Sequence, residues 1–190
     1  MIDPTRVVYR DATIADARAL SQIARATFLA TFAHLYPIAD RNIFLATTYA
    51  PDIQAAEIAD PATRHRLAFC DEALVGFAKL GALKLPIAAP RPALELHRLY
   101  LVEEAKGAGI ADALMDWAEN SARALGAADL YLGVYQGNAR AQRFYARRGY
   151  TIVGAYEFAV GETRDPEFIL TRALDAPAAP LSWAREESGR

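Results

Sequence analysis

The stretch EEAKGAGIADALM, residues 103–115, places small residues directly in front of a helical pattern of apolar residues. The first backbone amides of a helix have no intrahelical partners, and the helix dipole adds partial positive charge at that end. Glycine and alanine allow a phosphate to approach such amides closely, so the segment 107–111 is a candidate anion site. The same residues would also suit a plain strand-to-helix turn that needs glycine only for its backbone geometry.

Two common phosphate-binding motifs do not fit this turn. In a P-loop the lysine follows the glycines and precedes Ser or Thr, whereas Lys106 precedes the glycines here. The G-x-G-x-x-G pattern of dinucleotide-binding folds is not present in this turn either. The strand and helix patterns on either side of the turn are therefore needed to identify its function.

Hydrophobic patterns predict strands and helices along nearly the whole chain. Strand patterns cover 6–12, 65–70, 73–83, 94–102, 129–135, 150–160 and 166–174. Helical patterns cover 15–36, 39–59, 108–125 and 138–149, with Asp16 as the N-cap of the first and a break at Pro51 in the second. The order β-α-α-β-β-β-α-β-α-β-β predicts an α/β (α+β) fold, in which about four helices flank a mixed sheet of about seven strands.

Composition limits the classes of function. A chain of 190 residues fits one domain over 1–174 and a loose Ala/Pro-rich tail over 175–190. A net charge of −2 argues against nucleic-acid binding, and no apolar run is long enough to span a membrane. Three scattered histidines without an acidic cluster predict no metal site, and the single cysteine, Cys70, is expected to be a small buried side chain. With no signal-like segment visible, a cytoplasmic protein is expected.

A second motif follows the strand pattern at 129–135. The pattern N-x-x-A-x-x-F-Y-x-x-x-G-Y is formed by Asn138, Ala141, Phe144, Tyr145, Gly149 and Tyr150. Together with the glycine turn, it resembles the GCN5-related N-acetyltransferases, the GNAT superfamily, over about residues 6–174. In that superfamily the first motif has the form Gln/Arg-x-x-Gly-x-Gly/Ala, which here reads Lys106-Gly107-Ala108-Gly109-Ile110-Ala111. The resemblance implies the GNAT fold and an acetyl-CoA-dependent N-acetyltransferase.

The resemblance also assigns a coenzyme site. The pyrophosphate of acetyl-CoA would be held by the turn, at Lys106, Gly107, Ala108, Gly109, Ile110 and Ala111. Lysine keeps the positive charge of the usual arginine but loses its forked donor geometry. Backbone groups of Leu99, Tyr100 and Leu101 would bind the pantetheine arm, because the fourth and fifth strands splay apart in this superfamily. Asn138 would contact the coenzyme, a role that is compatible with a plain helix N-cap.

Tyr145 matches the superfamily tyrosine that protonates the departing thiolate as a general acid. A phenol has an ordinary pKa of about 10 and therefore carries a proton at neutral pH. The alternative for Tyr145 is a position in the core beside Phe144.

The general base is left open between Glu95, His97 and an ordered water. Glu95 and His97 lie two residues apart on one expected strand, which predicts a face shared with Leu99 and Leu101. Histone-type members of the superfamily carry a glutamate base on this strand, and Glu95 occupies the similar position. An unperturbed histidine has a pKa of about 6.5, which suits His97 for the same role.

The acceptor is less well defined by the sequence. His34 and Tyr36 are candidates for lining its site, although a surface position also fits His34. Segments such as LELHRLYL and LYLGVYQGNARAQRFYARRGY resemble bacterial spermidine/spermine acetyltransferases of the PaiA type. That type typically reads W-L-G-V-W-E-x-N, where this chain has Tyr131, Tyr135 and Gln136 in place of the two tryptophans and the glutamate.

The resemblance implies transfer to a small primary amine, such as a polyamine. A protein N-terminus or lysine as acceptor, and a non-catalytic module that binds acyl-CoA, are the alternatives. Members of this fold often form homodimers, which is compatible with this sequence but not indicated by it. The sequence does not identify the acceptor amine.

Overall fold

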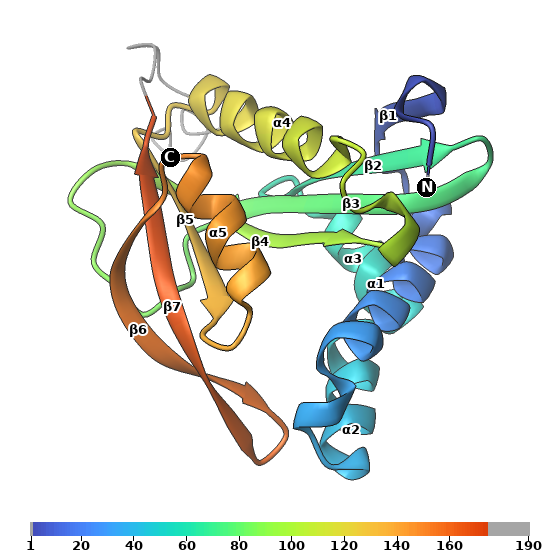
Figure 1. Ribbon diagram of the computed structural model, residues 1–190, viewed down its shortest axis with the longest axis horizontal. Helices are drawn as coiled ribbons and strands as arrows, with labels where there is room; N and C mark the ends of the chain where they lie inside the picture. Colours follow the sequence, from blue (N-terminus) through green and yellow to red (C-terminus); the bar gives the residue numbers. More distant parts are fainter. Residues whose placement is uncertain (1, 175–190) are drawn as a thin grey trace, which may run out of the picture.

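The computed structural model describes residues 2–174, which form a seven-stranded sheet with helices on both faces (Figure 1). The strands are β1 (Val7–Asp11), β2 (Arg64–Cys70), β3 (Ala73–Ala82), β4 (Ala93–Leu101), β5 (Asp129–Tyr135), β6 (Thr151–Val160) and β7 (Thr163–Ala173). Their order is β1-β2-β3-β4-β5-β7-β6, and only the pair β4–β5 is parallel within the described sheet. The predicted mixed sheet is confirmed, whereas the predicted tail, 175–190, lies outside the described residues.

The helices are α1 (Ala17–Phe32), α2 (Ile38–Thr48), α3 (Pro51–Ala59), α4 (Ile110–Ala124) and α5 (Ala139–Arg147). Pro51 opens α3, where its fixed φ and missing N–H are tolerated, so the predicted break is confirmed. Asp16 precedes α1 as predicted, but its carboxylate accepts from the Thr13 amide at 2.8 Å rather than from the helix. No helix within residues 2–174 combines the length and hydropathy that a bilayer-spanning segment needs.

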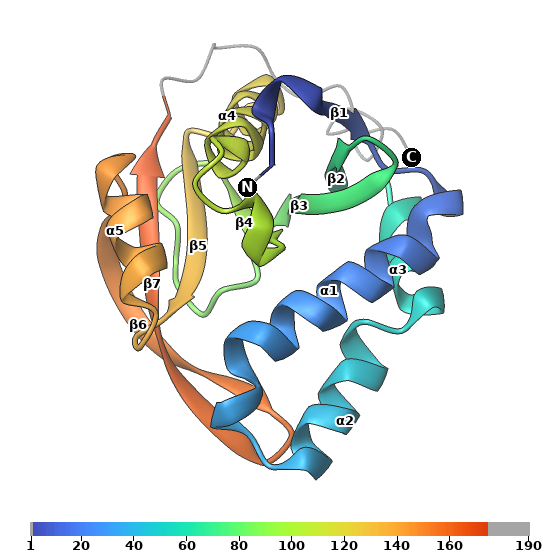
Figure 2. The same cartoon turned by 45° about the vertical axis from the view of Figure 1, so that its right-hand side comes forward.

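The helices form two layers. Helices α1, α2 and α3 cover one face of the sheet, and α4 and α5 cover the other (Figures 1 and 2). Leu20 and Phe28 of α1 are buried against Phe77 of β3 on the first face. On the second face, Leu114 of α4 belongs to a larger core, and Cys70 packs at the margin of that core and is only partly buried.

The sheet opens in its middle. Parallel pairing of β4 and β5 is confined to residues 93–95 opposite residues 129–131. Beyond these residues the strands diverge, so that β1–β4 and β5–β7–β6 become two arms with a gap between them (Figure 1). The predicted splay of the fourth and fifth strands is confirmed. Because strand edges in the gap have no strand partner within the described sheet, an extended ligand can pair with them.

A β-bulge on β4 corrects one expectation from the sequence. The register between β3 and β4 shifts by one residue, which leaves His97 as an extra residue on β4. A bulge of this kind interrupts the alternation of side chains between the two faces of a strand. Leu99 and Leu101 therefore pack against the core beneath α4. The predicted face shared by these leucines with Glu95 and His97 is wrong.

The hairpin of β6 and β7 reaches across the gap to α2. Its turn contains Gly161, with φ of 60°, at the position predicted from the sequence. The carboxylate of Asp40, in the first turn of α2, accepts hydrogen bonds from the Thr163 amide at 3.2 Å and the Thr163 hydroxyl at 2.8 Å. The hairpin tip consequently lies beside α2 (Figures 1 and 2) and joins the ends of the two arms.

Candidate active site

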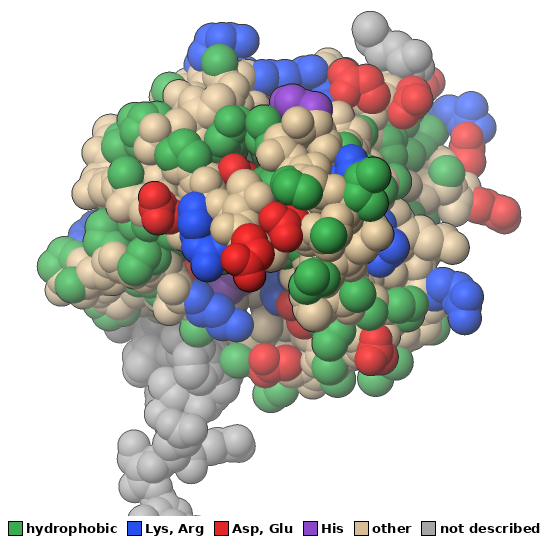
Figure 3. Space-filling view, turned by 90° about the horizontal axis from the view of Figure 1, so that it is seen from below, with side chains coloured by type: hydrophobic (Ala, Val, Ile, Leu, Met, Phe, Trp, Pro, Cys, Tyr) green, Lys and Arg blue, Asp and Glu red, His purple; other side chains and the backbone are tan. Residues whose placement is uncertain are grey.

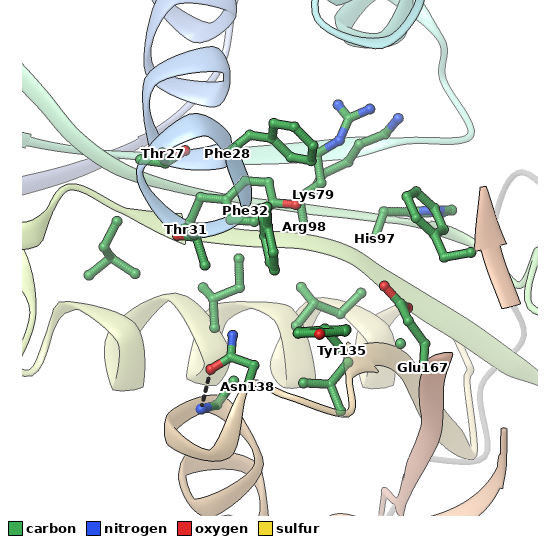
Figure 4. A pocket seen from close by; sticks show the side chains of 18 of the residues that line it. Thr27, Phe28, Thr31, Phe32, Lys79, His97, Arg98, Tyr135, Asn138 and Glu167 are labelled. Carbon is green, nitrogen blue, oxygen red and sulfur yellow. Dashed lines mark hydrogen bonds between the residues drawn. The ribbon is translucent and has the colours of Figure 1, made fainter. Parts of the chain in front are cut away.

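A cavity of about 1170 Å³ lies between the two arms of the sheet. It extends from the glycine turn and α5, past the diverging strands, to α1, α2 and the hairpin. Figure 4 shows part of it, with Phe28 and Phe32 of α1 facing Tyr135 and Asn138. The predicted residues that line it are Glu95, His97, Leu99, Tyr100, Leu101, Lys106, Gly107, Gly109, Ala111, Asn138 and Tyr145. Ala108 packs against the core and Ile110 is fully buried in it, so neither side chain borders the cavity.

The glycine turn has a backbone conformation that glycine adopts readily. Gly107 and Gly109 have φ of 85° and 77°, and apart from the glycine and its chain neighbours no heavy atom of the described chain lies within 4 Å of a Cβ built on either. Helix α4 begins at Ile110, two residues later than expected, and Gly109 in front of it provides no side-chain cap. The positive φ values explain the glycines on geometric grounds. The open space in front of the first amides also provides room for an anion.

Basic side chains surround this turn. Lys106 Nζ lies 2.5 Å from Glu103 Oε2, and Arg140 Nη1 lies 3.5 Å from Glu103 Oε1. Arg143 and Arg147 line the same cavity from α5. The sequence reasoning missed the three arginines, although positions 140, 143 and 147 share one face of a helix. Glu103 partly offsets the charges of Lys106 and Arg140, and Arg143 and Arg147 add further positive charge to the cavity.

Helix α5 brings Asn138 and Tyr145 to the cavity. Asn138 Oδ1 accepts from the Ala141 amide at 3.1 Å, so it is an N-cap, while its amide nitrogen points toward the cavity in Figure 4. Tyr145 packs edge-on against Phe144 and Tyr150, with ring centroids 5.3 and 5.8 Å away. Burial raises the pKa of Tyr145, which keeps the phenol protonated at neutral pH. Tyr145 thus both packs in the core and borders the cavity.

Glu95 and His97 differ in the contacts that their side chains make and in their pKa. Glu95 Oε2 accepts hydrogen bonds from the amides of Lys84 and Leu85, at 2.7 and 3.1 Å, and so fixes the loop after β3. Burial raises the pKa of Glu95. His97 Nδ1 lies 3.4 Å from Glu95 Oε1, but burial and the nearby Lys79 lower the pKa of His97 to about 3. His97 is therefore neutral at physiological pH and a weak base.

Buried charges form a network on the wall made by β3 and β4. Glu57 Oε1 lies 2.6 Å from Lys79 Nζ, and Glu57 Oε2 lies 2.5 Å from Arg98 Nη1. The Arg98 guanidinium also lies over the ring of Tyr49, 5.0 Å from its centroid. Glu57 thus shares its carboxylate between two cations, and Glu95 is a second carboxylate on this wall. No group of three His, Cys, Asp or Glu side chains in the described chain is arranged to hold a metal ion.

Two carboxylate–tyrosine pairs on the opposite wall were missed from the sequence. Tyr156 Oη donates to Glu167 Oε2 at 2.6 Å, and the Tyr36 hydroxyl donates to Asp165. All four side chains line the cavity. Asp165 and Glu167 lie two residues apart on β7, so their side chains share one face of the strand. This spacing is the feature of the sequence from which the acidic wall could have been predicted. Tyr36 thus lies at the cavity as expected, whereas His34 is exposed on the surface.

These features together point to one class of protein. Splayed strands, an uncapped helix N-terminus and a buried tyrosine together suit a phosphate-bearing thioester and its departing thiolate. The model of the acetyltransferase (GNAT) family matches residues 20–150. The chain belongs to this family, and the predicted enzyme class, an N-acetyltransferase with acetyl-CoA as the acyl donor, is confirmed.

Proteins with similar sequences are also described as N-acetyltransferases. The chain is 32% identical, over 153 residues, to an uncharacterized N-acetyltransferase in the pepI 3′ region of Lactobacillus delbrueckii subsp. lactis, covering 80% of this chain and 88% of the relative. It is 36% identical, over 120 residues, to an uncharacterized N-acetyltransferase of Mycobacterium tuberculosis, covering 63% of this chain and 73% of the relative.

Solved structures confirm the GNAT fold. The PaiA N-acetyltransferase of Thermoplasma acidophilum, in complex with coenzyme A, matches with a TM-score of 0.71 and 24% identity, covering 88% of this chain and 98% of that one. The ribosomal-protein-S18-alanine N-acetyltransferase of Escherichia coli matches with a TM-score of 0.66 and 14% identity, covering 91% and 96%. At these identities the likeness is one of fold, and it does not select an acceptor.

Proposed function

We propose that the protein acetylates a small primary amine, with a polyamine as the first candidate, and that Tyr145 is the general acid. The observation that carries this proposal is the contact between the hairpin tip and α2, made through Asp40 and Thr163. Phe32 and Phe44 line the cavity behind this contact. A cavity that ends against a hairpin and aromatic side chains suits a small ligand better than a protein chain passing through it.

The coenzyme half of the cavity supports the role of Tyr145. Acyl transfer to an amine needs a neutral amine, a polarised thioester carbonyl and a proton for the leaving thiolate. With the pyrophosphate at the turn and the pantetheine arm along residues 99–101, the thioester would lie at the splay. Tyr145, protonated because burial raises its pKa, would give its proton to the thiolate as the C–S bond breaks.

The acceptor half supports a cationic amine. Asp165 and Glu167 lie on one face of β7, and both line the cavity. Two carboxylates suit an acceptor that carries more than one ammonium group. The outer surface at this end shows hydrophobic, acidic and basic side chains interspersed (Figure 3). Such a mixed surface gives little long-range steering to a charged protein acceptor.

The test is thiol release from acetyl-CoA with a panel of acceptors: spermidine, simple alkylamines, lysine and peptides. We expect turnover with at least one small amine and a loss of about 100-fold in kcat for Tyr145→Phe. Tyr9→Phe is the matched control, because it removes a hydroxyl on β1 that is not among the cavity lining. Turnover with peptides alone would overturn the small-amine proposal, and coenzyme binding without any thiol release would favour a binding module.

A further inference from the structure

Glu167 lies where the sheet opens. It pairs with Tyr135 of β5, beyond the short stretch in which β4 and β5 are paired. In Figure 4 its side chain extends from β7 into the cavity, toward β4 and below His97. An arm bound between β4 and β5 would present its acyl end in this part of the cavity. The carboxylate is therefore placed beside the proposed reaction centre, although no sequence motif includes it.

Gly133 makes room for this carboxylate. A Cβ on Gly133 would lie 2.6 Å from Glu167 Oε2 and 2.7 Å from Tyr156 Oη. The backbone of Gly133 does not have a positive φ, so turn geometry does not account for the glycine. Glycine inside a strand often marks the close approach of another group. Here that group is the hydrogen-bonded pair of Glu167 and Tyr156, which lies across the face of β5.

We propose that Glu167, held by Tyr156 over Gly133, binds the ammonium group of the acceptor and removes its proton as the general base. This inference rests on the proposed function, because it needs an acceptor that arrives as an ammonium ion. It adds to the proposed general acid Tyr145 a second catalytic residue, which lies on the opposite face of the sheet from α5.

The surroundings of Glu167 suit this role. The groups that face it are Tyr156 and Asp165 on the hairpin, Glu95 and Tyr100 on β4, and Tyr36 before α2. Burial raises the pKa of Glu167 to about 7, against the opposing hydrogen bond from Tyr156 and with smaller upward contributions from Asp165 and Glu95. A general base is most effective when its pKa lies near the working pH. Glu167 can therefore be ionised to accept a proton and can release it again.

The two walls of the cavity favour this side for an ammonium ion. Lys79 and Arg98 share the single carboxylate of Glu57 on the wall made by β3 and β4, which repels a cation. Asp165 and Glu167 are on the hairpin wall, and their only close partners among the described residues are tyrosine hydroxyls. An acceptor ammonium ion is therefore drawn toward the carboxylates of the hairpin and away from Lys79 and Arg98.

Glu95 and His97, the other candidates, are less suited to act as the general base. Glu95 already accepts two backbone hydrogen bonds through one of its oxygens. The pKa of His97 is lowered to about 3, so the neutral imidazole has little tendency to take a proton from an ammonium ion.

The proton balance of the reaction is complete with these two residues. Glu167 takes one proton from the ammonium group, and the nitrogen lone pair then forms the N–C bond to the thioester carbonyl. The C–S bond breaks, and the thiolate takes the phenol proton of Tyr145. The second proton lost by the amine nitrogen restores Tyr145, and Glu167 releases its proton to solvent. The products are the acetamide, coenzyme A with a free thiol, and one proton.

The test is the pH dependence of kcat/KM for the best amine in Glu167→Gln and Tyr156→Phe. The wild-type rate should rise with pH through an apparent pKa near 7, because the carboxylate must be ionised. Glu167→Gln should lower kcat/KM roughly 100-fold at neutral pH and remove this limb. Tyr156→Phe removes a hydrogen bond that lowers the pKa of Glu167, so the limb should move to higher pH. Glu157→Gln, an exposed change on the same hairpin, should leave the profile unchanged.

The possible results distinguish a wrong assignment of the general base from a wrong proposed function. Thermal unfolding and coenzyme affinity, measured on each variant, distinguish a lost base from a lost fold. An active wild-type protein whose pH profile is unaltered in Glu167→Gln would overturn the assignment of the base alone. A wild-type protein that turns over no amine at all would overturn the proposed function, and this assignment with it.

Discussion

The two halves of the cavity are built in different ways. The half of the cavity that we propose for the coenzyme comes from two short segments: residues 99–111 run from the end of β4 to the start of α4, and residues 138–145 run from the N-cap of α5 into that helix. The acceptor half combines the end of α1, helix α2, strand β4 and the hairpin, which are far apart in the chain. In the proposed function the first half would act mainly through backbone amides, and the second through individual side chains. The difference implies that substitutions should separate coenzyme affinity from acceptor chemistry.

Gly133→Ala should give the largest difference between the effect on amine acetylation and the effect on coenzyme affinity. The new methyl group would collide with the ends of the Glu167 and Tyr156 side chains, which can swing away without unfolding the sheet. We expect kcat/KM for the amine to fall by about 100-fold, because the base is displaced, while coenzyme affinity measured by calorimetry stays nearly constant.

Gly154→Ala provides the matched control for that change. Its Cβ would meet Ile169 and Ile87 at 3.6 and 3.7 Å, which is ordinary contact, so activity should be retained. Equal losses of coenzyme binding and turnover in Gly133→Ala would contradict the separation of the two halves.

Gly109→Ala should have a smaller effect, and it should act on coenzyme affinity rather than on the chemistry of the acceptor. The methyl group would occupy the open space before α4 and force alanine into a positive φ of 77°. We expect coenzyme affinity to fall by about tenfold and the free energy of unfolding to fall by about 1 kcal/mol.

Gly126→Ala separates strain from binding. Gly126 has φ of 78° beyond the other end of α4, so the same substitution should cost similar stability without changing coenzyme affinity. If Gly126→Ala weakened coenzyme binding as much as Gly109→Ala does, the glycine turn would be a geometric feature only.

The smallest effect is expected where the two arms meet. Asp40→Asn weakens the hydrogen bonds that hold the hairpin tip against α2. We expect a rise of about threefold in KM for the amine, with kcat and coenzyme affinity little changed, because the hairpin still carries Glu167. Asp52→Asn, an exposed change in the first turn of α3, is the control. A large fall in kcat for Asp40→Asn would mean that the contact positions the chemistry itself.

The same contrast explains what the sequence could predict. The fold followed from local patterns, because proline breaks, hairpins and hydrophobic periods are short-range features. The two motifs indicated residues that nearly all line one cavity, and their role in binding the coenzyme stays a prediction. Ala108 and Ile110 differ because the start of α4 turns their side chains toward the core.

The acceptor half was not predictable in this way. The bulge at His97 depends on the register between β3 and β4, which no local pattern reveals. Glu167 lies in a strand that carries several other polar side chains, so nothing marked it out, and its partner Tyr156 is eleven residues away. Gly133 carried a readable signal, since glycine in a strand interior suggests close approach, but the group that approaches it comes from another strand.

The most direct test of the account is a crystal structure with a bisubstrate analogue that joins coenzyme A to an alkylamine. The account predicts that the pyrophosphate contacts the amides at residues 107–111 and the sulfur lies within hydrogen-bonding reach of the Tyr145 hydroxyl. It also predicts that the amine nitrogen lies beside Glu167. An amine nitrogen held by Glu95 or by the wall of Lys79 and Arg98, with Glu167 turned away, would contradict it.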